Sequence, residues 1–382
     1  MTPPSVPPRA RRSPLIAWAL AATAAVLVRL GLYALAARAH GGLATALCQF
    51  DCFWYARIGT QGYLSDAGWD NYGAVPNFAF FPLYPLLLGR LAALTGLSGV
   101  AAGMVISNLC LVGIAVLGLA YLRQAHVFLP AWIWILFLLA FPNSFFLSAV
   151  YTEALFGLLA LGCLHCLATS RPHLAALCAG LAAATRPTGI LLAPLVAADR
   201  LAHLRANWRT TPDRARLLAD AALPLALAPL GLALYIAAQY LLTGDGLAFT
   251  HVQLLWRREW LGPVEWFRIG LASWDWHRFP REPTHAYEAA WGLAGLAMAA
   301  WCARSRRFAE AFFLAGCVLL PAASGLDSLP RYVATNPVFL LALARPLARL
   351  PRPWPAAPLI IALAAAQYPL LRAWMSAWGG VF

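Results

Sequence analysis

The stretch FDCFWYARIGTQGYLSDAGWDNYGAVPNFAFFPLYP, residues 50–85, separates the first two long apolar runs of the chain. It places one carboxylate, Asp51, among aromatic side chains and ends in an aromatic run interrupted by proline. A segment that only connects two membrane spans does not need this composition. We therefore expect a loop, within the wider range 38–99, that holds Asp51 at the boundary between lipid and water.

Composition places the rest of the chain in a membrane. Of its 382 residues, 62% are hydrophobic and 11% are charged, whereas soluble domains carry about 25% charged residues. Several apolar runs approach the ~20 residues that a helix needs to cross a bilayer, and they are too long for the alternating strands of an outer-membrane barrel. The sequence therefore predicts an all-α polytopic membrane protein with a single domain, residues 14–382, after a disordered basic cytoplasmic segment, residues 1–13.

The apolar runs predict about eleven transmembrane helices. Their expected ranges are 14–37, 100–122, 127–142, 151–170, 174–184, 189–204, 216–242, 287–302, 308–323, 333–344 and 355–372. Arginine clusters at residues 9–12, 200–216, 304–307 and 345–352 indicate cytoplasmic segments by the positive-inside rule. The N-terminus is then cytoplasmic, and two long loops, 38–99 and 243–285, are external.

The acidic residues indicate which face carries the chemistry. Eleven of the fifteen are predicted at or beyond the outer boundary: Asp51, Asp66, Asp70, Glu153, Asp245, Glu259, Glu265, Asp275, Glu282, Glu288 and Asp327. Acidic residues contribute little to orientation, so this distribution predicts a site on the external face. The net charge of +13 comes from short loop clusters rather than a basic face with interleaved aromatics, so we expect no nucleic-acid partner.

Asp51 has a structural and a catalytic interpretation. It can be a helix cap or a solvated loop carboxylate, or it can be the general base that takes a proton from an acceptor hydroxyl. When a sugar leaves a lipid phosphate, the leaving group is already good, so one carboxylate suffices where most glycoside hydrolases need two. Tyr55, Tyr63 and Tyr151 are candidate substrate-binding residues beside this base.

Charged residues in or beside the predicted spans are the next candidates. Glu153 can favour the dipole of its own helix or orient a substrate. Arg186, inside the apolar hairpin 174–204, either pairs with Glu153 or binds an anionic head group, because a guanidinium fork suits phosphate. Arg331 and Tyr332 are either interfacial anchors or residues that bind the donor phosphate.

The external loop 243–285 supplies the remaining candidates, His251, Gln253, Trp256 and Arg257. Trp256 and Trp260 are four residues apart, which predicts one face of an interfacial helix or of a lid over lipid phosphate or sugar. The chain has no nucleotide-binding glycine loop, no HExxH and no Asp-x-Asp, so neither a metal nor another cofactor is implied. Cys48 and Cys52 would face an oxidising compartment, where they are either bridged or free.

Five motifs occur in one order: FDCFWYARIGTQGY with FAFFPLYPLL, FPNSFFLSAVYTEALF, AAATRPTGI, TGDGLAFTHVQLLW and SLPRY. This set resembles the PIG-V family, the second mannosyltransferase of GPI-anchor assembly and its bacterial relatives. The resemblance implies a C-type glycosyltransferase architecture with juxtamembrane helices in the first external loop. It also implies a polyprenyl-phosphate sugar donor, with mannose as the expected sugar, and inversion at the anomeric carbon.

On this resemblance Asp51 is the base, and Arg331 or Arg186 binds the phosphate. The usual tryptophan before the aspartate is Phe50 here. We expect a bacterial cytoplasmic-membrane enzyme that acts on the external face, with membrane lipid and a glycolipid, glycan or protein acceptor as partners. The alternatives are a transporter or lipid flippase, and a structural partner in an envelope complex.

Overall fold

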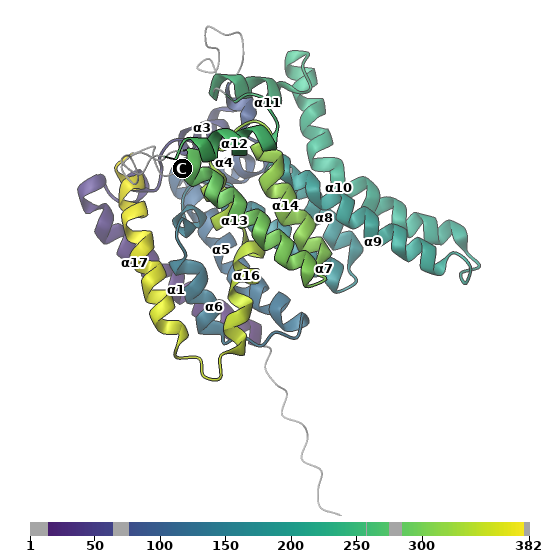
Figure 1. Cartoon of the computed structure of the whole chain (residues 1–382). Coiled ribbons are helices and arrows are strands. Elements are labelled where there is room, and N and C mark those ends of the chain that lie inside the picture. The colour runs from purple at the N-terminus through teal and green to yellow at the C-terminus, as the bar shows by residue number, and fades with distance from the viewer. Residues whose placement is uncertain (1–13, 64–75, 257, 275–284, 378–382) are drawn as a thin grey trace, which may run out of the picture.

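The computed structural model of the chain describes residues 14–63, 76–256, 258–274 and 285–377. Over these ranges every regular element is a helix (Figure 1). The prediction of an all-helical membrane protein is confirmed at this level. The segment 1–13, predicted to be disordered, lies outside the described residues, and so do parts of the two predicted external loops, residues 64–75 and 275–284.

Among the described residues, four helices are long and apolar enough to cross a membrane. They are α1 (Pro14–Ala36), α5 (Gly99–Gln124), α10 (Arg214–Thr243) and α17 (Ala356–Met375). Their boundaries lie within a few residues of four of the predicted spans. Large apolar side chains on these helices are exposed, for example Leu20 at 68% and Ile361 at 69%, which is the surface that a helix presents to lipid.

The other predicted spans are helices that do not reach the length or mean hydropathy of these four. They are α6 (Ala131–Ala140), α7 (Glu153–Ala168), α8 (Pro172–Ala183), α9 (Leu192–Asn207), α13 (His285–Arg304), α14 (Phe308–Ala322) and α16 (Pro337–Ala344). The prediction of about eleven full spans is therefore met only in part. Breaks between helices shorten the remaining elements, and Glu153, Arg186 and Arg331 lie at or beside three of these breaks.

The break between α6 and α7 is the most deeply buried of these. Residues 143–152, which include the 3₁₀ turn η4 (Ser144–Leu147), are all buried. Non-helical backbone at membrane depth is tolerated where protein surrounds it and pairs its polar groups. Gln367 of α17 does so here, because its Nε2 donates to the carbonyl oxygens of Leu139 and Phe141 at 3.1 and 2.7 Å. The break thereby brings Glu153, the first residue of α7, into the interior.

Two further breaks work in the same way. Helix α8 ends at Ala183, and the turn η5 (Pro187–Leu191) leads into α9, with Arg186 in extended conformation between them. The short helix α15 (Leu329–Ala334) stands before α16 and carries Arg331. Proline opens both η5 and α16, where it cannot continue the preceding helix. Glu153, Arg186 and Arg331, each at or beside one of these breaks, therefore lie together in the interior.

Short helices gather at one end of the molecule, which is the upper end in Figure 1. They include α3 (Cys52–Gln61), α4 (Leu83–Thr95), α11 (Ala248–His251) and α12 (Pro263–Ala272). The remaining short elements of the chain, not all of them at this end, are η1 (Ala37–His40), α2 (Leu43–Ala46), η3 (Pro76–Ala79), η6 (Val252–Trp256) and η7 (Arg345–Arg349). Helices α3 and α4 lie within the range 38–99, where juxtamembrane helices are expected.

Helices α3 and α4 touch backbone to backbone. A Cβ atom at Gly89 of α4 would collide with the carbonyl group of Gly59 in α3, so both positions require glycine. This contact fixes α3 against α4. Because Asp51 directly precedes α3, the contact also fixes the direction in which the Asp51 segment enters the structure.

The prediction that Trp256 and Trp260 share one helix face is wrong. The turn η6 ends at Trp256, and no helix continues through Trp260. The next helix, α12, begins only at Pro263, after Gly262 with φ of 83°. A glycine in this left-handed region and a following proline mark a separate helix start rather than the middle of one helix.

Candidate functional site

Asp51 occupies the N-cap position of α3, yet its side chain accepts no hydrogen bond from the helix. The carboxylate therefore does not serve as a cap, which was one of the two structural alternatives. The backbone of the segment is held instead by Tyr151. The Asp51 N–H donates to Tyr151 Oη at 3.1 Å, and the Tyr151 hydroxyl donates to the Gln49 carbonyl at 3.0 Å. The Asp51 side chain stays 31% exposed.

A disulfide joins Cys48 to Cys52 across this segment. The sequence left open whether these two cysteines are bridged, and in this structure they are. Asp51 lies inside the resulting small ring, next to Phe50, whose φ is 48°. A non-glycine residue in the left-handed region is uncommon and needs support from its surroundings.

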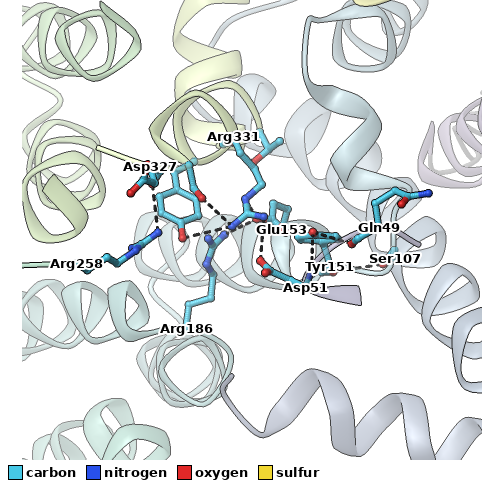
Figure 2. A network of polar contacts seen from close by, with 12 residues as sticks. Gln49, Asp51, Ser107, Tyr151, Glu153, Arg186, Arg258, Asp327 and Arg331 are labelled. Atoms are coloured by element: carbon cyan, nitrogen blue, oxygen red, sulfur yellow. Dashed lines mark hydrogen bonds and ion pairs between the residues drawn. The ribbon is translucent and has the colours of Figure 1, made fainter. Parts of the chain in front are cut away.

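Arg331 connects Asp51 to Glu153 (Figure 2). Its Nη1 donates to Asp51 Oδ2 at 3.2 Å, and its Nε lies 3.1 Å from Glu153 Oε1. Arg186 Nη1 lies 3.2 Å from the same oxygen of Glu153. The pairing of Arg186 with Glu153, which was the structural alternative for Arg186, is present, and Arg331 extends it to Asp51.

Asp51, Glu153, Arg186 and Arg331 form a charge-balanced group in which only Asp51 is substantially exposed. The side chains of Glu153, Arg331 and Arg186 are 1%, 8% and 13% exposed. Buried charges are costly unless they are paired, and two arginines face two carboxylates here. Asp51 is the group through which this network reaches solvent, because its carboxylate has the largest exposure of the four.

Tyr332 lies against both arginines. Its ring centroid is 4.2 Å from the guanidinium carbon of Arg186 and 5.2 Å from that of Arg331, and its hydroxyl accepts from Arg331 Nη2 at 3.5 Å. Burial opposes ionisation of the phenol, but the charges of Arg331 and Arg186 outweigh it and lower the pKa of Tyr332 to about 7. The phenol therefore changes charge near neutral pH.

Asp51, Arg186, Arg331 and Tyr332 line one cavity of about 570 Å³. This volume is within the usual range for sites that bind small molecules. Its walls combine polar side chains (Thr185, Thr188, Gln253, Arg258, Ser324, Asp327 and Ser328) with apolar ones (Phe80, Phe81, Ile190, Leu232, Trp260 and Leu320). A cavity with both kinds of wall suits an amphiphilic ligand whose charged group lies between the arginines.

The structure separates the other predicted substrate residues into two groups. Tyr55 and Gln253 line the cavity. Tyr63 has a structural contact instead, because its hydroxyl donates to the Phe80 carbonyl at 2.6 Å and its ring stacks on Phe78. His251 is exposed and lies 2.7 Å from Asp245.

Two further candidates cannot be placed. Arg257 and the side chain of Trp256 lie outside the part of the chain that the structure describes.

Sequence reasoning did not name Arg258 or Ser328 as site candidates, although both line the cavity, and it named Asp327 only among the acidic residues of the predicted external face. Arg258 is adjacent to the predicted Arg257, and its Nη2 donates to the Asp327 carbonyl at 3.4 Å (Figure 2). Asp327 directly precedes the SLPRY motif and Ser328 is its first residue, so their closeness to Arg331 in the sequence was a usable signal. Trp260, a residue of the predicted interfacial helix or lid, also lines the cavity.

Within the described ranges, one group has the composition of a metal site. Ligand atoms of His285, Glu288 and Asp327 lie within 4.8 Å of one another. His285 Nδ1 is 3.0 Å from Glu288 Oε2, so these two side chains already satisfy each other. Asp327 is the member that also lines the cavity.

Comparison with known proteins gives one family and one solved structure. A family model described as "Mannosyltransferase (PIG-V)" matches residues 22–266. This range includes Asp51, Glu153 and Arg186, whereas Arg331 and Tyr332 lie beyond its end. No curated protein is similar enough to count as a relative.

Among solved structures, the chain is similar to the crystal structure of the Archaeoglobus fulgidus oligosaccharyltransferase in complex with Zn and sulfate. The sequence identity is 15% and the TM-score is 0.45. The similarity covers 95% of this chain and 53% of that protein, so the chain spans about half of its length.

Proposed function

The chain belongs to the mannosyltransferase (PIG-V) family, whose model covers more than half of it, and on this premise we propose a specific reaction for the cavity. In this reaction mannose moves from a polyprenyl-phosphate donor to a hydroxyl group of a cell-envelope acceptor. Asp51 is the general base, and Arg331 and Arg186 bind the donor phosphate. The supporting observation is that all three residues line the same cavity.

Family membership confirms the enzyme class that the sequence predicted, a glycosyltransferase of the membrane. The alternatives of a transporter or flippase and of a structural envelope component lose their support accordingly. The acceptor, the linkage and the identity of the donor belong to the proposal.

The proposed transfer is a single displacement. The acceptor oxygen forms a bond to the anomeric carbon of mannose while the bond from that carbon to the phosphate oxygen breaks. The electron pair of the broken bond leaves with the polyprenyl phosphate, and the hydroxyl proton passes to the Asp51 carboxylate. A single displacement inverts the anomeric configuration, and no second carboxylate is needed because phosphate leaves as a stable anion.

The two arginines have a defined part in this step. Negative charge on the phosphate oxygen increases as the glycosidic bond breaks, and fixed cations beside it stabilise that charge without reorganising. Glu153 holds both guanidinium groups by one oxygen, so it positions them relative to each other. Before the donor binds, Arg331 is paired with Asp51 at 3.2 Å. A bound phosphate adds negative charge beside Arg331 and so weakens its hold on Asp51, which makes the carboxylate a better proton acceptor.

The donor also explains the apolar walls. Ile190, Leu232 and Leu320 line the same cavity as the charged residues, and a prenyl chain needs an apolar surface near its phosphate. We place the cavity on the external face of a bacterial cytoplasmic membrane. The arginine clusters mark other loops as cytoplasmic by the positive-inside rule, and the cavity is lined from loops predicted on the opposite side, for example by Arg258 and Asp327.

The test uses the full-length protein in detergent with radiolabelled polyprenyl-phosphate mannose and a cell-envelope lipid extract as acceptor. We expect wild type to release mannose from the donor by transfer or slow hydrolysis. Asp51→Asn should lower the rate by about 10²–10⁴-fold, the usual contribution of general base catalysis, without changing the thermal unfolding midpoint. Full activity of this folded variant would remove Asp51 from the base role. Absence of turnover in wild type, with several lipid-linked sugars, would reject the proposed donor class.

A further inference from the structure

The Cys48–Cys52 disulfide closes a ring around the residue proposed as the base. The two cysteines are four positions apart, and only Gln49, Phe50 and Asp51 lie between them. The other cysteines of the chain are free: Cys110, Cys163, Cys166, Cys178, Cys302 and Cys317. All eight cysteines lie within the described ranges, and the one bridge among them encloses the proposed base.

Non-covalent contacts also hold the side chains of the ring segment. Gln49 Nε2 donates to the Thr45 carbonyl at 2.9 Å, the Phe50 ring centroid is 5.5 Å from that of Trp374, and Asp51 pairs with Arg331. Asp51 makes no capping bond, and Phe50 is 47% exposed with φ of 48°. Two hydrogen bonds to Tyr151 hold the backbone on one side. Without a covalent link, a short segment with a residue in the left-handed region gains conformational entropy and samples other conformations.

Asp51 needs this restraint because its neighbour is a cation. Arg331 Nη1 is 3.2 Å from the carboxylate, and Arg331 is in turn held by Glu153. A shift of the segment would change both the distance from Asp51 to the acceptor hydroxyl and the ion pair with Arg331. Displacements of about 1 Å at a reacting group cost on the order of 10²-fold in rate.

We propose that the Cys48–Cys52 disulfide is a positioning device for Asp51, and that opening it switches the transferase to a slow form. This inference rests on the proposed role of Asp51 as the base. Opening requires a dithiol reductant, which supplies two electrons and two protons. The S–S bond breaks, two thiols form, and the reductant becomes a disulfide. Cys48 is partly exposed whereas Cys52 is buried, so the reductant attacks at Cys48.

The kinetic test compares oxidised protein with protein treated with dithiothreitol, in the same donor assay. Reduction should lower kcat by about 10–100-fold and leave the KM for the donor within about twofold, because Glu153 still holds Arg331 and Arg186 when the ring segment moves. Reoxidation should restore kcat. Cys48→Ser should resemble the reduced wild type, and its rate should no longer respond to the reductant.

A second measurement does not depend on turnover. Thiol counting in denaturant should give six thiols in the oxidised protein and eight after reduction. The Asp51 N–H donates a hydrogen bond to the Tyr151 hydroxyl at 3.1 Å. Hydrogen exchange at this amide should become faster on reduction, while the amides of α5 remain protected. If oxidised wild type transfers no sugar, the proposed function fails, and this exchange experiment still tests the positioning role.

Three results would overturn the inference. Oxidised protein with eight thiols would show that the bridge does not form. An unchanged kcat in fully reduced protein would show that the non-covalent contacts of the segment hold Asp51 without the bridge. A loss of kcat that is matched by loss of the folded fraction, measured by the thermal unfolding midpoint, would make the bridge a general stabiliser rather than a positioning device.

Discussion

Two buried glutamates of this protein each face two arginines, and they differ in what the arginines contact next. Glu153 is paired through its Oε1 with Arg186 and Arg331. Glu310 of α14 is paired with Arg307 at 2.6 Å and with Arg345 at 2.8 Å. Side-chain exposure is 1% for Glu153 and 6% for Glu310, so burial does not distinguish them.

The partners of the two carboxylates do distinguish them. Both oxygens of Glu310 accept hydrogen bonds, Oε2 from Arg307 and Oε1 from Arg345 and from the Tyr121 hydroxyl. In the Glu153 group, Arg331 continues to Asp51, which is 31% exposed and lines the large cavity. The Glu310 network is therefore closed: among the described residues, its arginines form no ion pair with a residue that lines the cavity. The Glu153 network is open, because it ends at Asp51 in a cavity that can take a ligand. A buried ion pair is thus a candidate site only where one of its members remains available.

The largest expected effect concerns the open network. Arg331→Met removes the cation that we assign to the donor phosphate, so kcat/KM for the donor should fall by about 10²–10³-fold. Arg331→Lys should recover only part of this loss, because an ammonium group cannot reach Glu153, Asp51 and a phosphate together as a guanidinium fork does. The measurement is the initial rate of mannose release.

Arg345→Met is the matched control, because it removes an arginine from the closed network. Its specific activity per folded molecule should stay near wild type. Equal losses of specific activity in Arg331→Met and Arg345→Met would contradict the assignment of the ligand site to the Glu153 network alone.

The next effect concerns the stability of the closed network. Glu310→Gln leaves Arg307 and Arg345 without their anionic partner, and breaking a buried pair costs about 3 kcal/mol or more. Denaturant or thermal unfolding in detergent should show this loss, with activity of the folded fraction retained. Glu153→Gln should lower both stability and activity, so a purely structural phenotype there would place Glu153 outside the site.

A smaller effect concerns pH. The pKa of Tyr332 is lowered to about 7, so the phenol is neutral below that pH and anionic above it. The anion would compete with the donor phosphate for Arg186 and Arg331. The KM for the donor should therefore rise by about fivefold or more between pH 6 and pH 8, since charges about 4 Å apart interact by about 1 kcal/mol even in water. Tyr332→Phe should abolish the rise, and an unchanged profile in that variant would assign the pH dependence to another group.

The smallest effect separates Tyr63 from Tyr55. Tyr63→Phe removes one hydrogen bond to the Phe80 carbonyl and should cost about 1 kcal/mol of stability without changing donor kinetics. Tyr55 lines the cavity, so a substitution there should change the KM for a substrate. A kinetic defect in folded Tyr63→Phe would restore Tyr63 as a substrate-binding residue.

The helices and one ion pair could be predicted because they depend on hydrophobic length, helix-breaking residues and the cost of an unpaired charge. The apolar length of α1, α5, α10 and α17 and the prolines at Pro142, Pro187 and Pro337 follow from the chain itself. The pairing of Arg186 with Glu153 was a predictable alternative, because a charge inside an apolar hairpin needs a partner. The assignment of Trp256 and Trp260 to one helix failed because Gly262 and Pro263 start a new helix beyond them. The C-type architecture stays a prediction of the family resemblance.

The sequence by itself determined a membrane protein with helical elements at nearly the observed boundaries, and it marked the family through motifs of neighbouring residues. Hydrophobic length and helix-breaking residues act locally, so these properties need no knowledge of the fold. Tertiary structure alone decided that Arg331 reaches Asp51 across 280 positions of the chain, that Arg258 lines the cavity, and that the Tyr63 hydroxyl bonds to the Phe80 carbonyl. These contacts join segments far apart in sequence, and their formation depends on how the broken helices pack against one another.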